Sequence, residues 1–143
     1  MKKLIYTLLI IIALTNNSFA AGSSSDSDST PKASDYTKAK NLIKAAKKYE
    51  KKGKIDKAQE RYAKAQKLLL KSNDKKPLQA DTLNYLGFTT RKLGDYEGGE
   101  KFYLQGLQIE PNHNGINEYL GELYVTTNRM DMAKERLEVL KTC

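Results

Sequence analysis

Cysteine and histidine are almost absent from this chain of 143 residues, which contains one of each, Cys143 and His113, and no tryptophan. A single cysteine cannot form an intramolecular disulfide bond or a cysteine-based metal site. A lone histidine has no second imidazole to complete a metal site, and no Ser/His/Asp motif includes it. Because His113 follows Pro111-Asn112, we predict a solvated turn residue there. The sequence therefore indicates no catalytic residue, metal ligand or cofactor, and we do not expect an enzyme.

The N-terminus lacks an apolar run long enough to cross a membrane. Leu4–Leu14 is apolar apart from two weakly polar residues, and Lys2 and Lys3 precede it. A helix of this length would measure roughly 17 Å, whereas a bilayer core is ~30 Å thick. Small residues flank Phe19 in Ser18-Phe19-Ala20, as at a signal peptidase site. We predict a bacterial signal peptide over residues 1–20, cleaved after Ala20, and therefore a periplasmic or secreted protein.

Large apolar residues are also missing from the next segment, AGSSSDSDSTPKAS, which extends to Ser34. Such a segment cannot bury enough surface to offset the entropy lost on ordering. We predict a disordered Ser-rich linker over residues 21–37 and a folded domain over residues 38–143.

The folded part repeats itself. A shift of 34 residues places Tyr85-Leu86-Gly87 on Tyr119-Leu120-Gly121, and a shift of 41 aligns the beginning of the domain with its middle. The difference between the shifts is accounted for by a polar stretch, 73–79, which we interpret as a longer turn. Periods of this size are typical of stacked helical hairpins. The sequence predicts three repeats, at about 39–72, 80–113 and 114–143.

Each repeat divides into two helical patterns. In the middle repeat the first helix is expected from about Asp81 to Lys92 and the second from about Tyr96 to Ile109. Between them Gly94 suits a left-handed turn, and Asp95 can cap the second helix. Small residues recur where two helices would cross at close approach, namely at Gly87, Gly99 and Gly106.

The middle repeat resembles a tetratricopeptide repeat, through Leu83, Leu86-Gly87, Tyr103 and Pro111, with Thr90 and Gly99 as departures from the family pattern. The third repeat is also similar to it, and the first is looser. The resemblance implies an all-α fold, a superhelical solenoid of three helical hairpins. It also implies a scaffold that binds a protein or peptide in a concave groove lined by the first helix of each pair. The groove residues expected from this are Lys44, Lys47, Lys51, Asn84, Phe88, Arg91, Glu118 and Glu122.

Phe88 has two interpretations. It either contacts the partner or packs against the neighbouring helix. Some relatives use Lys and Asn residues to bind a C-terminal carboxylate, but the acidic Glu118 and Glu122 argue against a full clamp of this kind.

The positive charge is concentrated in the first repeat. Residues 39–72 carry twelve basic and three acidic residues, a net charge of +9, whereas residues 80–113 carry −2 and residues 114–143 carry −1. The alternative function is therefore a peripheral binder of an anionic membrane or polymer, using the Lys-rich first hairpin. A solvated lysine face is the simpler interpretation, and nucleic acid is not an expected partner of an exported protein.

The C-terminal end suggests self-association. Cys143 either joins two chains through a disulfide bond or remains an inert thiol. No further helix follows the third repeat in this sequence, so we expect the apolar face of Leu137 and Leu140 to be poorly covered.

Overall fold

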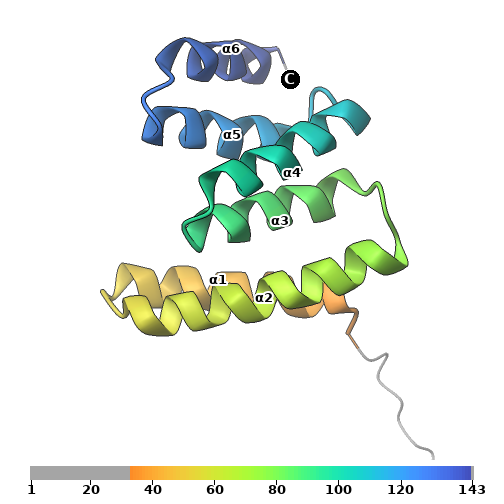
Figure 1. Cartoon of the computed structure of the whole chain (residues 1–143), viewed down its shortest axis with the longest axis vertical. Coiled ribbons are helices and arrows are strands. Elements are labelled where there is room, and N and C mark those ends of the chain that lie inside the picture. The colour runs from red at the N-terminus through yellow and green to blue at the C-terminus, as the bar shows by residue number, and fades with distance from the viewer. Residues whose placement is uncertain (1–32, 143) are drawn as a thin grey trace, which may run out of the picture. The chain divides into compact units, whose positions relative to one another are not determined.

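The computed structural model describes residues 33–142, and this part of the chain contains helices and no strand. The helices are α1 (Asp35–Lys51), α2 (Ile55–Lys75), α3 (Ala80–Lys92), α4 (Tyr96–Ile109), α5 (Asn114–Thr126) and α6 (Met130–Lys141) (Figure 1). The predicted signal peptide, most of the predicted linker and Cys143 lie outside the described residues.

Consecutive helices form three hairpins, α1–α2, α3–α4 and α5–α6, and each hairpin stacks on the next (Figure 1). One hydrophobic cluster fills the first hairpin and extends onto α3, and a second cluster is centred on Tyr103 of α4 and the apolar residues of α5. Tyr119 packs against both clusters. The predicted all-α solenoid of three helical hairpins is confirmed.

The three hairpin turns are built alike. Gly53, Gly94 and Asn128 each have a positive φ, of 69°, 98° and 57°. Glycine adopts this left-handed conformation without steric cost, and asparagine tolerates it better than most residues. The side chain of Asp95 then accepts a hydrogen bond from the backbone N–H of Gly98 at 2.8 Å, which caps α4 as predicted.

Close helix crossing requires the small residue at Gly87. A Cβ atom at this position would lie 2.5 to 2.8 Å from three ring carbons of Tyr103, which is itself fully buried. The ring of Tyr103 on α4 therefore occupies the space beside α3 that a side chain would need. At this crossing α3 and α4 can pack closely only if the residue at position 87 is small and leaves room for the large ring of Tyr103.

The first hairpin is longer than the sequence pattern indicated. α1 begins at Asp35, where Ser34 caps the helix by accepting a hydrogen bond from the N–H of Thr37. α2 continues to Lys75, so the interpretation of 73–79 as a turn was wrong for its first three residues. The ammonium of Lys75 lies 2.8 Å from the Asp35 carboxylate and joins the two helix ends. This hydrogen bond holds the pKa of Asp35 below its usual value.

The third hairpin ends in an open helix. No residue of α6 is buried, and Leu137 is 52% exposed. A shallow cavity of about 310 Å³ lies between α5 and α6, with Val125, Met130 and Leu140 in its lining. The sequence had predicted this poor coverage of Leu137 and Leu140. No helix in the described part of the chain is long and apolar enough to span a membrane.

Candidate functional site

The first helices of the three hairpins, α1, α3 and α5, meet through aromatic side chains. The rings of Tyr36 on α1 and Tyr85 on α3 pack edge to face with centroids 5.9 Å apart. The rings of Phe88 on α3 and Tyr119 on α5 lie 4.9 Å apart. Three of these rings are only partly buried, whereas Phe88 is 3% exposed. We call the surface formed by Tyr36, Tyr85 and Tyr119, with the lysines above them, the first-helix face.

Two lysines of α1 lie over these rings. The Nζ atom of Lys40 is 5.4 Å from the ring centroid of Tyr36 and 5.9 Å from that of Tyr85. The Nζ atom of Lys47 is 4.5 Å from the Phe88 centroid and donates a hydrogen bond of 3.0 Å to the Tyr119 hydroxyl. An ammonium over a ring face is attracted by the quadrupole of the ring. The aromatic surface and the positive charge are therefore combined at one place.

An ion pair joins two of the helices that form this face. The guanidinium of Arg91 on α3 donates a 2.7 Å hydrogen bond to the carboxylate of Glu122 on α5. Arg91 is only 9% exposed, whereas the side chain of Glu122 is 52% exposed. Removing Glu122 would leave a nearly buried charge without this partner, so the pair ties α3 to α5.

A second polar node joins the first two hairpins. Glu50 on α1 accepts hydrogen bonds from the Tyr62 hydroxyl, at 2.9 Å, and from the Lys92 ammonium. Partial burial would raise the pKa of Glu50, but these two donors outweigh it and hold the pKa below its usual value. The carboxylate therefore stays charged near neutral pH and connects α1, α2 and the end of α3.

The predicted groove residues divide into exposed and buried groups. Lys44, Lys51, Glu118 and Glu122 are exposed, and Lys47 is partly buried. Asn84, Phe88 and Arg91 are buried. Phe88 packs between the rings of Tyr62 and Tyr119, which is the arrangement expected if it packs against neighbouring helices. The structure brings together Lys47, Phe88, Arg91 and Glu122, with Arg91 5.8 Å from the Phe88 ring.

Sequence reasoning missed Tyr36, Lys40, Tyr85 and Tyr119. A signal was present for two of them, since Tyr85 and Tyr119 occupy equivalent places in their repeats, each directly before a Leu-Gly pair. A tyrosine repeated beside the packing residues indicates an equivalent position on the surface of the two helices. Tyr36 has no counterpart at the same place, and its contact with Tyr85 depends on how the hairpins stack.

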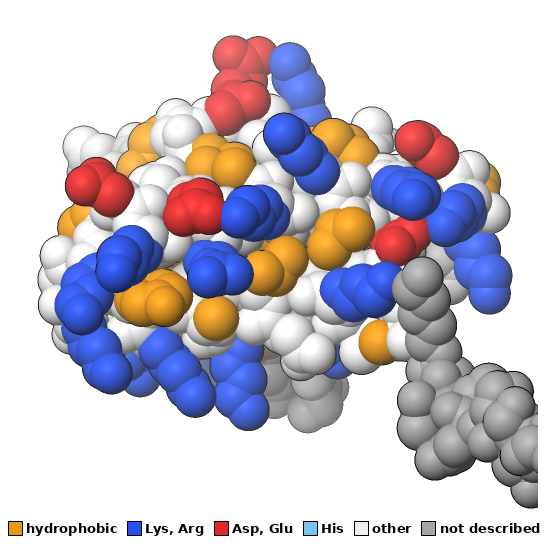
Figure 2. Space-filling view, turned by 90° about the horizontal axis from the view of Figure 1, so that it is seen from below, with side chains coloured by type: hydrophobic (Ala, Val, Ile, Leu, Met, Phe, Trp, Pro, Cys, Tyr) orange, Lys and Arg blue, Asp and Glu red, His pale blue; other side chains and the backbone are white. Residues whose placement is uncertain are grey.

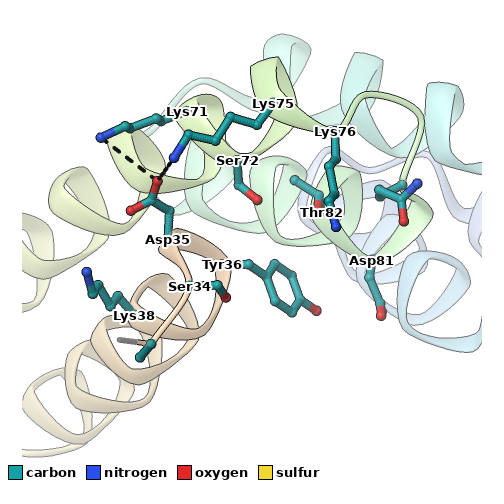
Figure 3. Close-up of a pocket in the computed structure, with 12 residues that line it drawn as sticks. Ser34, Asp35, Tyr36, Lys38, Lys71, Ser72, Lys75, Lys76, Asp81 and Thr82 are labelled. Carbon is teal, nitrogen blue, oxygen red and sulfur yellow. Dashed lines mark hydrogen bonds and ion pairs between the residues drawn. The ribbon is translucent and has the colours of Figure 1, made fainter. Parts of the chain in front are cut away.

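A cavity of about 630 Å³ lies where the ends of α1, α2 and α3 meet (Figure 3). Lys71 and Lys75 point across its edge to the Asp35 carboxylate, and Tyr36 and Asp81 lie at the opposite side (Figure 3). The full lining is Ala33, Ser34, Asp35, Tyr36, Lys38, Lys71, Ser72, Lys75, Lys76, Gln79, Asp81 and Thr82. It offers charged and hydroxyl groups but no histidine or cysteine, and it gives no indication of nucleophilic catalysis.

His113 is not a solvated turn residue, and that prediction was wrong. Its Nδ1 atom accepts a hydrogen bond from the backbone N–H of Ile116 and caps α5, and its Nε2 atom lies 3.3 Å from Asp81. Its side chain is 13% exposed. Within residues 33–142 there is no group of three or more His, Cys, Asp or Glu residues arranged to hold a metal ion. His113 therefore has a structural role as the cap of α5.

Comparison with known proteins identifies the repeat. Residues 80–113 match the family model of the tetratricopeptide repeat. A structure of a MamA point mutant is similar over 73% of this chain and 96% of that chain, with 16% identity and a TM-score of 0.52. The second tetratricopeptide domain of Spaghetti (RPAP3), bound to the HSP90 peptide SRMEEVD, has 17% identity over 75% of this chain and 93% of that chain, with a TM-score of 0.47. Among curated proteins none matches significantly.

At these identities the similarity to solved structures concerns the fold alone. Together with the match of the middle repeat, the three stacked hairpins define an α-helical repeat scaffold. The middle hairpin is therefore a tetratricopeptide repeat, and the fold of the described residues is that of a tetratricopeptide-type solenoid. Proteins built from such repeats typically act as modules for protein–protein interaction.

Proposed function

We propose that this chain is an exported interaction module that binds an acidic segment of another protein on its first-helix face. The observation that carries the proposal is the placement of Lys40 and Lys47 over the rings of Tyr36, Tyr85 and Tyr119. In this function the chain binds and does not catalyse. We take this face to serve as the groove that the resemblance to the family implies.

The lysines along α1 support an acidic partner. Lys40, Lys44 and Lys51 are exposed and have no ion-pair partner among the described residues. They lie beside Lys47 on the side of α1 that faces the aromatic rings, because residues three, four and seven apart share a helix face. Their charges are therefore available to carboxylates of a partner.

The opposite end of the same face has the opposite charge. Glu118 and Glu122 are exposed on α5, and Arg91 neutralises only the second. A bound segment would place its acidic residues over α1 and neutral or basic residues over α5. The partly exposed rings between them offer an apolar, polarisable surface for the rest of the segment. The charges thus favour one direction of binding.

A selection experiment tests this function. Phage-displayed random dodecapeptides selected on the full mature chain should be enriched in Asp and Glu. The variant Lys40→Glu/Lys44→Glu/Lys51→Glu should bind the selected peptides at least about tenfold more weakly, since exposed charge pairs contribute about 0.5 kcal/mol each. Fluorescence anisotropy measures the affinity.

The control is Lys52→Glu/Lys57→Glu/Lys64→Glu, which changes the net charge equally on the same hairpin but away from the rings. It should keep the affinity within about threefold, allowing for long-range effects of charge. Selected peptides without acidic residues, or an equal loss of affinity in both variants, would contradict binding on the first-helix face.

Export is a separate part of the proposal and has its own test. When the full sequence is expressed in a bacterium, intact-mass spectrometry should find a mature chain beginning at Ala21 in the periplasm or the medium. Ala20→Arg removes the small residue next to the cleavage site and should leave the uncleaved precursor. A wild-type chain that keeps Met1–Ala20 and stays in the cytoplasm would disprove export.

A further inference from the structure

Net charge is distributed unevenly along the solenoid formed by the described residues. Residues 35–76, which form the first hairpin and the residue after it, hold fourteen lysines and one arginine against five acidic residues, a net charge of +10. Residues 77–142, with the other two hairpins, hold seven basic and ten acidic residues, a net charge of −3. One end of the molecule is therefore strongly basic and the remainder is weakly acidic.

Many of these lysines lie on the end of the solenoid, away from α3. Lys48 on α1 and Lys52, the residue directly after α1, are four residues apart. On α2, Lys57, Lys64, Lys71 and Lys75 follow one another at intervals of seven, seven and four residues, which places them on one side of the helix. Two lysines of the α2 row reach Asp35 on α1, so the row lies along the seam between the helices. We call this surface the outer face of the first hairpin, and its lysines are Lys48, Lys52, Lys57, Lys64, Lys71 and Lys75.

Figure 2 views the hairpin from this end and shows Lys and Arg side chains on both sides of a broken line of hydrophobic side chains. Tyr49 and Leu68 are partly buried hydrophobic residues that pack against the core from the two helices. Ala45 and Tyr49, with Lys48 and Lys52, line a shallow cavity of about 230 Å³ on α1. The charged groups thus surround a narrow apolar seam.

Much of the charge on the outer face is free to act on a partner. Lys48, Lys52 and Lys57 are exposed and have no ion-pair partner among the described residues. Lys64 pairs with the exposed Glu60, and Lys71 and Lys75 share a single carboxylate, Asp35. Because these acids neutralise only part of the charge, the face remains positive.

We propose that the outer face of the first hairpin binds the surface of a bilayer that contains anionic lipids. Long lysine side chains place their charge at headgroup level while their stems cover the apolar seam. The charge is spread along two helices, as needed for a partner whose anionic groups are mobile in a plane. The acidic second and third hairpins would be repelled, so the solenoid would stand with its first hairpin against the membrane.

Other polyanions fit this face less well. Proteins often hold the phosphates of a nucleic acid with arginine forks and stack aromatic side chains on its bases, but this hairpin has one arginine, Arg61, among its fifteen basic residues. A protein interface usually buries a core of large apolar or aromatic residues. On the outer face Tyr49 and Leu68 are already partly buried in the hairpin core, which leaves little apolar surface for such an interface.

This surface differs from the one proposed for peptide binding. The first-helix face uses Lys40, Lys44 and Lys51, whereas the outer face includes Lys52, Lys57 and Lys64. The scaffold would therefore hold a partner on one side of α1 while its end contacts the membrane. The two triple charge reversals introduced above separate these functions, because each serves as the control for the other.

Vesicle sedimentation with the full mature chain tests the proposal. The chain should bind vesicles of three parts phosphatidylcholine to one part phosphatidylglycerol, should not bind pure phosphatidylcholine, and should dissociate as salt is added. Lys52→Glu/Lys57→Glu/Lys64→Glu should lower the partition coefficient at least about a hundredfold, since each lysine near an anionic surface contributes about a fivefold factor. Lys40→Glu/Lys44→Glu/Lys51→Glu should lower it by less than about tenfold, and circular dichroism should show both variants folded.

Three results would overturn the proposal. Anionic vesicles that bind no better than neutral ones would exclude the lipid surface. Equal losses in the two variants would show attraction by net charge without a specific face. Tighter binding to duplex DNA or to polyglutamate than to the anionic vesicles, at the same salt concentration, would assign the face to another class of partner. Peptide binding retained in any of these cases would leave the proposed function intact.

Discussion

Gly87→Ala is expected to lower the free energy of unfolding by about 1–3 kcal/mol, although alanine is the better helix former by about 1 kcal/mol. The reason is the Tyr103 ring, because three of its carbons would lie within 2.8 Å of the new Cβ atom. Tyr103 is 0% exposed and packs in the second cluster, so its ring has little room to move. Urea unfolding followed by far-UV circular dichroism measures the change.

The next repeat supplies the control. Gly121 lies 34 residues after Gly87 and has the same place in its hairpin, but a Cβ atom there meets only the Cβ of Arg136, at an ordinary 3.5 Å. Gly121→Ala should therefore stabilise the chain by up to about 1 kcal/mol. Opposite signs at two equivalent glycines would show that the partner across the crossing decides the outcome.

The ring of Tyr103 explains the difference, because no equivalent side chain lies within 4 Å of a Cβ atom at Gly121 other than the Cβ of Arg136. Leu137 occupies in the third hairpin the position that Tyr103 occupies in the second. Tyr103→Leu should by itself lower the free energy of unfolding, because it leaves a cavity. In the Tyr103→Leu background, however, Gly87→Ala should cost less free energy than it costs in the wild-type chain. If the free-energy costs of the two substitutions were simply additive, contact between the methyl group introduced by Gly87→Ala and the Tyr103 ring would not be the cause of the destabilisation.

The hairpins could be predicted because the signals for them are local. Gly94 and Asp95 specify the turn and cap between α3 and α4, and the spacing of Leu83 and Leu86 specifies the buried side of α3. Neither signal depends on a distant part of the chain. The same holds for the ends of α4, where Pro111 follows the helix. The turn and cap residues, together with the helical spacing of apolar residues, therefore predicted the number and order of the helices.

Side-chain burial on α3 could not be predicted in this way. Ten of its thirteen residues are buried, because α3 lies against α2, α4 and α5, with α1 also nearby. A helical periodicity assigns one buried face and leaves the others free, so Asn84 and Arg91 were expected on an open surface, and Phe88 was left with two interpretations. In the central helix of a stack that assumption is wrong. The partner helices of Phe88, carrying Tyr62 and Tyr119, come from the hairpins before and after it.

The surface residues were missed for a related reason. Tyr36 and Lys40 belong to α1, and their aromatic and cation–π contacts are with Tyr85 of the next hairpin. Which lysine of a Lys-rich helix lies over which ring depends on the angle between hairpins. The sequence contains many equivalent lysines and no local sign that distinguishes Lys40 and Lys47 from the others.

Alkaline conditions should unfold the chain through its buried tyrosines. Tyr62 and Tyr103 are both 0% exposed, and burial raises the pKa of each hydroxyl well above 10. A nearby Arg91 opposes this shift at Tyr103, but the effect of burial is larger. The hydroxyls stay protonated in the folded chain, whereas in the unfolded chain they ionise at pH ~10.

The sign of the effect follows from proton binding. Below pH ~10 both states carry the two protons, and the stabilisation from these groups is complete. Above pH ~10 the unfolded chain releases protons that the folded chain keeps, so the free energy of unfolding decreases as pH rises. The slope for two groups is at most about 2.7 kcal/mol per pH unit. Urea unfolding at a series of pH values, with tyrosinate absorbance recorded in parallel, measures it.

The two tyrosines can be separated by removing their hydroxyls. Either Tyr62→Phe or Tyr103→Phe should reduce the alkaline slope by up to about 1.4 kcal/mol per pH unit, since each removes one ionising group. At neutral pH the variants should differ. Tyr62→Phe loses the hydrogen bond to Glu50 and should cost about 1–2 kcal/mol. The Tyr103 hydroxyl is buried with no hydrogen-bond partner among the described residues, so Tyr103→Phe should be neutral or stabilise by up to about 1 kcal/mol. A slope unchanged in both variants would show that another group controls alkaline unfolding.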